Sequence, residues 1–355
     1  MIIKGNMIKT CTVLLAVLAL MFLSSSCRST TPPGGTNPPT NPSEPGQPAE
    51  PITPAGYVSK MGVGLDVNWA LFKREIRAYT KQMPQDMAKR GFTHARIRFK
   101  IVDDKKYLDH LEKVVRDTLD TGMYAIITLA AMEFNEKADE ASLKKAVDWW
   151  RTVAERFKGY PGKLAFDLHI EPGKNLNKLD SPELLLKFYR ESLKVVRPLH
   201  PKRVIFLAPR YWAQPEGLPE IEGLFNKGDK YLGAESHFYA AGPSKDSKSK
   251  SRWTTGTPEE KAMVQKHVDL MVEWRKKTGV PVWQGAWMPG NYNRGNDYTV
   301  EEQVVFATFV SCALRKAHIP YSVNADQHFY DVNKKEWLDY MKPVVDALLN
   351  PECGE

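Results

Sequence analysis

Short apolar segments alternate with longer amphipathic segments along the chain from Met61 onward. Eight segments have the length and apolar content of buried strands: residues 62–67, 94–99, 124–130, 164–170, 203–209, 231–238, 281–287 and 319–325. Between them, apolar residues recur near helical spacing over residues such as 104–121, 143–157, 182–197, 258–278 and 300–317. Regular alternation is typical of a parallel sheet, and eight units favour a closed barrel. We therefore expect an α/β fold, a (β/α)8 TIM barrel, over residues 57–355.

The first 56 residues lack this pattern. Lys4 and Lys9 precede an apolar run, residues 12–23, that is too short to span a bilayer. The run ends in LSSSC, which resembles a bacterial lipoprotein processing site, although Ser24 stands where leucine is usual. We expect a lipoprotein signal peptide over residues 1–26, a lipid on Cys27 and a location in the bacterial cell envelope. The alternative is a cleaved signal peptide with an incidental cysteine.

Residues 27–56 are rich in proline, threonine, serine and glycine, a composition typical of an extended linker rather than a core. No acidic cluster follows Cys27, so export to the cell surface is not indicated, and the membrane leaflet stays open.

Composition and charge narrow the function classes. The chain is 42% hydrophobic and 26% charged, which is an ordinary globular composition. The net charge of +8 is spread along the chain apart from residues 244–252, a run that reads as a solvated loop or, alternatively, as a surface for an acidic partner. No nucleic-acid motif and no glycine-rich phosphate loop accompany it. Cys312 and Cys353 lack metal-like spacing, and a disulfide between them stays open. We expect a monomer without cofactor or metal.

In such a barrel the chemistry lies at the carboxyl ends of the strands. Alternation along a strand predicts Asp167, His169 and Glu171 on one side of the fourth strand. It likewise predicts Glu235, His237 and Tyr239 on one side of the sixth. The other candidates near strand ends are Trp69, Arg96, Arg98, Glu133, Arg210, Trp212, Trp287, Asn324, Asp326 and His328. Tryptophan faces suit sugar rings, and the polar groups suit hydroxyls, so the set indicates a poly- or oligosaccharide site.

Five motifs extend this interpretation. They are GVGLDVNW, KRGFTHARIRF, FDLHIEP, HFY and PVWQGAW, each at a predicted strand end and in order. With them, the chain from about Met61 to Leu349 resembles glycoside hydrolase family 5, the cellulase-like group of retaining barrel enzymes. The resemblance implies that Glu171 is the general acid/base and that Arg96 supports the nucleophile. It also implies that His237, Tyr239 and Trp287 line the site near that nucleophile.

The departures from the family pattern concern the catalytic residues. The nucleophile position holds Ala286, the asparagine before the acid/base is Ile170, and the tryptophan of the eighth strand is Asn324. A retaining glycosidase needs two carboxyl groups about 5 to 5.5 Å apart, and a methyl group cannot replace one of them.

Two interpretations follow. In the first, Glu235, Asp326 or Glu133 pairs with Glu171 in an inverting hydrolysis, at a separation of about 6.5 to 9.5 Å. In the second, the protein binds a glycan without cleaving it. Hydrolysis of a glycosidic bond is our first prediction. Because Arg98 and Arg210 could pair with a carboxylate or sulfate, we also expect that the sugar could be anionic.

Overall fold

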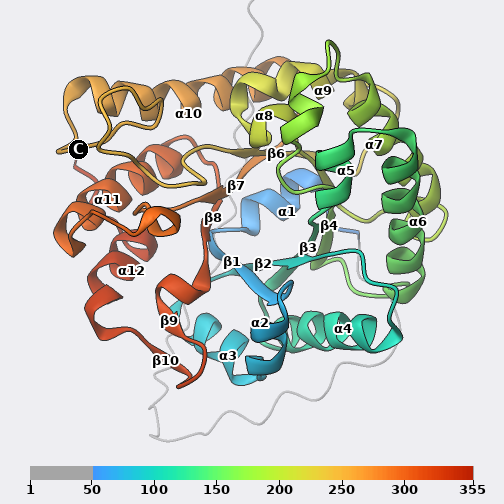
Figure 1. The fold of residues 1–355 in the computed structure, drawn as a ribbon, viewed down its shortest axis with the longest axis horizontal. Coiled ribbons are helices and arrows are strands. Elements are labelled where there is room, and N and C mark those ends of the chain that lie inside the picture. The colour runs from blue at the N-terminus through green and yellow to red at the C-terminus, as the bar shows by residue number, and fades with distance from the viewer. Residues whose placement is uncertain (1–50, 355) are drawn as a thin grey trace, which may run out of the picture. The chain divides into compact units, whose positions relative to one another are not determined.

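Eight parallel strands close into a barrel. The computed structural model describes residues 51–354, within which the strands pair in chain order and β8 pairs with β1 (Figure 1). The strands are β1 Val63–Ala70, β2 His94–Phe99, β3 Tyr124–Leu129, β4 Leu164–Asp167, β5 Ile205–Leu207, β6 Leu232–His237, β7 Val282–Trp287 and β8 Tyr321–Asn324. The predicted (β/α)8 barrel is confirmed. Every strand but β1 lies within its predicted range, and β1 continues to Ala70.

Helices surround the barrel (Figure 1). The five predicted from periodicity are present as α4 Lys105–Asp120, α6 Glu140–Arg156, α7 Glu183–Val196, α10 Pro258–Thr278 and α11 Val300–Lys316. The others are α2 Lys73–Ala78, α3 Gln82–Arg90, α5 Met132–Lys137, α8 Arg210–Ala213, α9 Leu218–Phe225 and α12 Lys342–Leu349. Helices α10 and α11 each begin with a capping box, in which a threonine and a glutamate three residues later satisfy each other's backbone N–H groups. These caps explain why the predicted starts of both helices are correct.

Helix α1, Pro54–Lys60, packs against the inside of the barrel at the amino-terminal ends of the strands. Its Tyr57 is fully buried, and the Tyr57 hydroxyl donates to the carbonyl oxygens of Ala125 and Lys163 at 3.2 and 3.0 Å. The Tyr57 ring meets the Phe206 ring edge-on. Helix α1 therefore closes this end of the barrel, and the opposite end is left for a functional site.

The barrel interior changes from apolar to charged along its axis. Above Tyr57, the rings of Phe206 and Trp283 pack at a centroid distance of 5.4 Å. The guanidinium of Arg96 lies 5.7 Å from the centre of the Trp283 ring. Arg96 begins a buried layer of charged groups beneath the carboxyl ends of the strands.

Part of the predicted organisation lies outside the described residues. This applies to the signal peptide, to Cys27 and to the linker as far as residue 50. Among residues 51–354, no helix is long and apolar enough to cross a membrane. Cys312 on α11 and Cys353 form a disulfide, so the pairing that the sequence left open is present.

Candidate functional site

A buried arginine organises the charged layer at the carboxyl ends of the strands. Arg96 on β2 is fully buried and pairs with Asp66 on β1, Asp167 on β4 and Glu235 on β6, at 3.1, 3.0 and 2.5 Å. The three carboxylates outweigh the burial that would lower the pKa of Arg96, and they raise it above its ordinary value. No part of the Arg96 side chain is exposed, so this structure does not support the prediction that Arg96 contacts the substrate. Its role is to hold three strands together at the floor of the site.

The charges in this layer balance through one shared proton. Burial raises the pKa of Asp167 to about 8, and the neighbouring negative charge of Glu235 adds to this. Among residues 51–354, Asp167 Oδ1 and Glu235 Oε2 have no other hydrogen-bond partner, and the two carboxyl groups interact with each other. A hydrogen bond between two carboxyl groups requires one of them to be protonated. At neutral pH we therefore assign a proton to Asp167 and a negative charge to Glu235.

Glu235 lies directly against strand β7. A side-chain carbon placed on Gly285 would lie 1.8 Å from Glu235 Oε1, so only glycine leaves room for this carboxylate. Glu235 is fully buried, and Ala286, next along β7, is also buried. The Glu235 carboxylate has no exposed surface, so this structure does not support the prediction that Glu235 activates a water at the sugar. Its negative charge instead stabilises Arg96 and His237 from beneath.

His237 connects this layer to Glu171. Its Nε2 lies 2.8 Å from Glu235 Oε1, and its Nδ1 lies 3.2 Å from Glu171 Oε1. Burial alone would lower the pKa of His237, but the charge of Glu235 and the hydrogen bonds to Glu171 and Glu235 together outweigh it, and the pKa is raised to about 9. At neutral pH the imidazolium therefore donates one hydrogen bond to each carboxylate. Burial would raise the pKa of Glu171, but the His237 bond and charge prevail, so that the Glu171 pKa is lowered and Glu171 is ionised.

Glu171 is the acidic side chain of this group that reaches solvent. Its side chain is 32% exposed, whereas Asp66, Asp167 and Glu235 are fully buried. Strand β4 ends at Asp167, and Glu171 has a positive φ of 49°, so the strand alternation does not continue to it. Of the three residues predicted on one side of this strand, Asp167 contacts Arg96 and Glu171 contacts His237. His169 does not take part in these contacts.

His169 supports the segment that carries Glu171. It is fully buried against Phe134 and Phe188, and its Nε2 lies 2.9 Å from Asn135 Oδ1. The Asn135 side chain in turn donates to the Glu171 carbonyl oxygen at 3.1 Å and accepts from the Gly173 N–H at 3.0 Å. This buried position does not support the prediction that His169 binds substrate, and Asn135 was not predicted from the sequence. Asn135 lies in the short helix α5, and neither a helical period nor a motif marks it in the sequence.

An exposed tryptophan lies beside Glu171. Trp212 is 41% exposed, and its ring covers Gly173, where any side-chain carbon would lie 2.6 Å from the ring. The Trp212 N–H donates to the Pro172 carbonyl oxygen at 3.0 Å, and both Tyr211 and Trp212 have positive φ angles. This backbone holds an exposed aromatic face next to the segment of Glu171, as a sugar-stacking residue requires.

Three further predicted residues are partly exposed on the same face. Arg98 Nη2 pairs with Asp66 at 2.6 Å and also donates to Asn324 Oδ1. His328 stacks on Tyr292 at a centroid distance of 4.2 Å, and burial lowers the His328 pKa to about 4. His328 is therefore neutral at physiological pH, and the charge of Arg98 is largely balanced by Asp66.

Two predicted tryptophans are not available to a ligand. Trp69 is fully buried, and its indole N–H donates to Asp326 Oδ2 at 2.7 Å. Asp326 is 1% exposed, and burial raises its pKa to about 7. Trp287 is also fully buried, packed on Phe306 of α11 and on Tyr321. Their burial does not support the predictions that Trp69, Asp326 and Trp287 contact the sugar directly.

Three more predicted residues turn away from the site. Tyr239 is buried against Phe306 on the helix side of the sheet. Arg210 is 3% exposed and pairs with Glu220 at 2.6 Å, so it is not free to bind an anionic sugar. Glu133 lies on α5 and forms salt bridges with two lysines. In residues 51–354, no group of three or more His, Cys, Asp and Glu is arranged to hold a metal ion.

The sequence of this barrel matches a known protein family. The model of the cellulases, glycosyl hydrolase family 5, matches residues 59–324, which is well over half of the chain. This chain belongs to glycosyl hydrolase family 5. The match includes β1 to β8 and the segment of Glu171, so the whole barrel is the family 5 domain.

Two curated relatives of this chain are named endoglucanases. Endoglucanase H of Acetivibrio thermocellus is 23% identical over 312 residues, covering 83% of this chain and 33% of that protein. Endoglucanase 1 of Ruminococcus albus is 30% identical over 128 residues, covering 32% of this chain and 30% of that protein. The chain thus spans about a third of the length of these relatives.

Solved structures have the same fold. A hyperthermophilic endo-β-1,4-glucanase in complex with substrate has a TM-score of 0.71 at 21% identity, covering 84% of this chain and 99% of that one. Endoglucanase Cel5A from Thermotoga maritima has a TM-score of 0.70 at 19% identity, covering 84% and 100%. At these identities the likeness shows the fold of the family 5 barrel and not its substrate.

Proposed function

We propose that this family 5 protein hydrolyses a glycosidic bond in a poly- or oligosaccharide, with Glu171 as the general acid/base. The observation that carries the proposal is the arrangement of Glu171. It is partly exposed at the carboxyl end of β4, and a charged imidazole bonded to a second carboxylate orients it. Trp212 offers an apolar face beside it for a sugar ring.

The proton for the leaving group comes through His237. Because Glu171 is ionised at neutral pH, it cannot itself begin as an acid. His237 holds a proton on Nδ1, directed at Glu171 Oε1. We propose that this proton passes to Glu171 and on to the glycosidic oxygen as the C1–O bond breaks. A water adds to C1 from the opposite face and releases a proton to the solvent, and the His237–Glu171 pair then takes up a proton from the solvent.

The family's covalent route is closed in this chain. We place Ala286 at the nucleophile position of the family and Ile170 at the asparagine before the acid/base. Without a carboxylate at residue 286, no glycosyl-enzyme intermediate forms. Direct attack by water on the face opposite the leaving group inverts the anomeric centre, so we expect the released sugar to have the inverted configuration.

A second candidate is glycan binding without cleavage. A specific observation favours it: Asp66, Asp167, Glu235 and Asp326 are at most 1% exposed, so none of them can activate the attacking water. Glu171, Trp212 and the polar rim would then bind the sugar, and the protein would retain it at the envelope.

Release of reducing ends by the full chain tests the proposal. Structures of Thermotoga maritima Cel5A hold cellobiose and mannotriose, so β-1,4-glucans and mannans come first, followed by anionic polysaccharides. Glu171→Gln should abolish release, and the matched control Glu133→Gln, an exposed glutamate on α5, should not. NMR of the fresh product gives its anomeric configuration.

The outcomes separate the two candidates. Release that persists in Glu171→Gln would reject Glu171 as the acid/base. No release from a glycan that binds with measurable affinity, together with weaker binding by Trp212→Ala, would establish the binding protein.

We also propose that Cys27 carries a lipid and anchors the barrel in the bacterial cell envelope through residues 28–56. The sequence LSSSC and the Pro-rich composition after it support this proposal. Labelling of cells with a fatty-acid analogue should mark the chain, and Cys27→Ala should remove the label. A label retained by Cys27→Ala would reject lipidation at this residue.

A further inference from the structure

A cavity of about 650 Å³ lies at the amino-terminal end of the barrel, the opposite end from Glu171. Its walls come from α1, from the segments that precede β1, β2, β7 and β8, and from the end of α12. The volume is within the range of cavities that hold small organic ligands, about 300–1,000 Å³. None of the residues discussed around Glu171 lines it.

Three arginines line this cavity: Arg90 on α3, Arg275 on α10 and Arg315 on α11. Arg90 is neutralised by Asp346 at 2.6 Å. Arg275 instead donates to the carbonyl oxygens of Ala317 and His318 at 2.8 and 3.1 Å. These acceptors carry no net charge, so the charge of Arg275 is not compensated by them.

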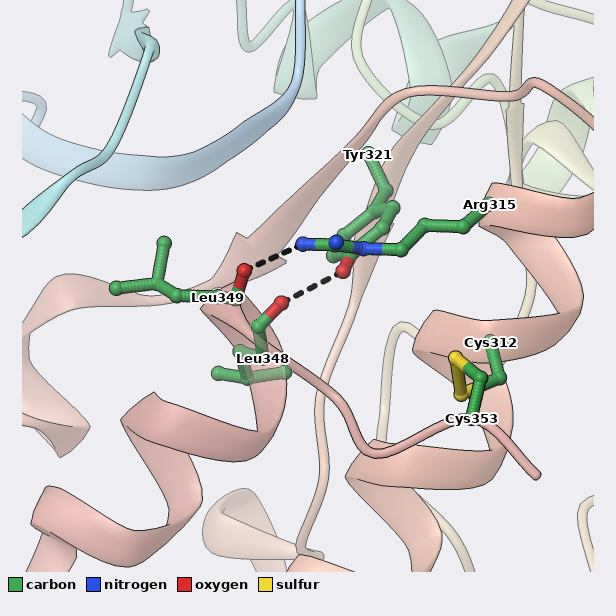
Figure 2. The surroundings of a disulfide bond; sticks show 6 residues. All are labelled: Cys312, Arg315, Tyr321, Leu348, Leu349 and Cys353. Atoms are coloured by element: carbon green, nitrogen blue, oxygen red, sulfur yellow. Dashed lines mark hydrogen bonds between the residues drawn. A yellow bond between two sulfur atoms is a disulfide. The ribbon is translucent and has the colours of Figure 1, made fainter.

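Arg315 is placed in the same way. Figure 2 shows its guanidinium bonded to the carbonyl oxygen of Leu349, beside the ring of Tyr321. Within residues 51–354, neither Arg275 nor Arg315 forms a salt bridge with a carboxylate. Each guanidinium has five N–H donors, so both retain donors for another acceptor.

The rest of the lining is largely apolar. It includes Val58 on α1 and Met61 just after it, Ile319 and Tyr321 before and on β8, and Leu349 at the end of α12. The disulfide of Cys312 with Cys353 ties the chain after Leu349 to α11, which keeps this wall in place (Figure 2). Uncompensated guanidinium groups next to apolar walls match a ligand with an anionic group on an apolar body.

We propose that this cavity binds an amphiphilic anion, with Arg275 and Arg315 pairing with its carboxylate or phosphate and the apolar walls covering its chain. The ligand chemistry is that of a fatty acid or a lipid phosphate. This second site is independent of the glycan site, because the two share no residue and lie at opposite ends of the barrel.

Calorimetric titration of the full chain tests the proposal with three probes. Decanoate carries both an anionic group and an apolar chain, decan-1-ol carries only the chain, and inorganic phosphate carries only the charge. We expect decanoate to bind at least about ten times more tightly than either of the others. Equal affinity for decan-1-ol would overturn the role of the arginines, and equal affinity for phosphate would overturn that of the walls.

A charge-matched pair of variants assigns the binding to the cavity. Arg275→Met with Arg315→Met should weaken decanoate binding at least about tenfold. Lys276→Met with Lys316→Met removes the same charge from adjacent exposed residues that do not line the cavity, and it should leave the affinity within about twofold. If both pairs of variants weakened decanoate binding equally, general electrostatic attraction to the protein would explain the effect, and the proposal would be overturned.

A substitution that fills the cavity tests the proposal even if the double arginine variant does not fold. Ser59 is exposed on α1 and lines the cavity, and its hydroxyl donates only to the Gly56 carbonyl oxygen. Ser59→Phe should abolish decanoate binding without lowering the melting temperature. Unchanged binding in Ser59→Phe would place decanoate elsewhere and overturn the proposal.

Discussion

Replacing Glu235 by glutamine tests the electrostatic arrangement beneath Glu171. The Glu235 carboxylate lies 2.8 Å from His237 Nε2 and 2.5 Å from Arg96 Nη2, and it is fully buried. Glutamine has nearly the same shape without the charge. Because this charge is the largest of the effects that raise the His237 pKa against its burial, we expect the imidazole to lose its proton closer to neutral pH in the variant.

The size of the effect follows from the pKa of His237. It is raised to about 9 in the folded protein, against an ordinary value of 6.5. The difference of about 2.5 units corresponds to about 3.4 kcal/mol at 1.36 kcal/mol per unit. Since the folded-state pKa is the higher one, this contribution to stability is complete below about pH 6.5. It is lost as the pH rises through about 9.

Two measurements check this prediction. Histidine-labelled protein gives the pKa of His237 by NMR titration, with the signal assigned by its loss in His237→Asn. Urea unfolding gives the free energy of unfolding; the His237 share of its fall from pH 6.5 to above pH 9 should be about 3 kcal/mol, and most of this share should be absent in Glu235→Gln. The matched control is Glu216→Gln, because Glu216 also lies beside a histidine, His267, at 3.5 Å. A His237 pKa that moves by less than about half a unit in Glu235→Gln would refute the reasoning.

Three further predictions concern single features of the barrel. Trp212→Ala should weaken glycan binding about tenfold in calorimetry, because it removes the exposed ring beside Glu171, and unchanged affinity would exclude stacking there. Gly285→Ala should lower the free energy of unfolding by at least about 1–3 kcal/mol, since the added carbon would lie 1.8 Å from Glu235 Oε1; an unchanged urea midpoint would contradict this packing. Replacing Cys312 and Cys353 together by serine should cost about 2–4 kcal/mol, because their bond closes a loop with a separation of 41 residues. Equal melting temperatures for the oxidised and serine forms would show that this loop adds no stability.

The strands and the long helices could be predicted because their signals are local. Helix α10 begins at Pro258 and ends at Thr278, as the helical spacing and the following Gly279 indicate. The short elements could not be predicted. Helix α5 has six residues, too few for periodicity, and it carries Asn135, which bonds both His169 and the Glu171 carbonyl oxygen.

The interior of the site was harder to predict than its outline. Sequence reasoning placed Glu171, His237 and Trp212 at strand ends, and the structure brings Glu171 and His237 into contact. It could not distinguish a partly exposed carboxylate from a buried one, because Glu171 and Glu235 each follow or lie on an apolar strand. Exposure depends on what covers a residue from the neighbouring strands.

By itself, the sequence determined the barrel, the order of its strands and the residues that stand near their carboxyl ends. Hydrophobic periodicity and helix capping involve residues close together in the chain, so both can be recognised in the sequence. Only the tertiary structure decided that Arg96 gathers three carboxylates, that Trp69 and Trp287 are buried, and that arginines line a cavity at the opposite end. These features join residues far apart in the chain, where charge, burial and pKa depend on the packing of the whole barrel.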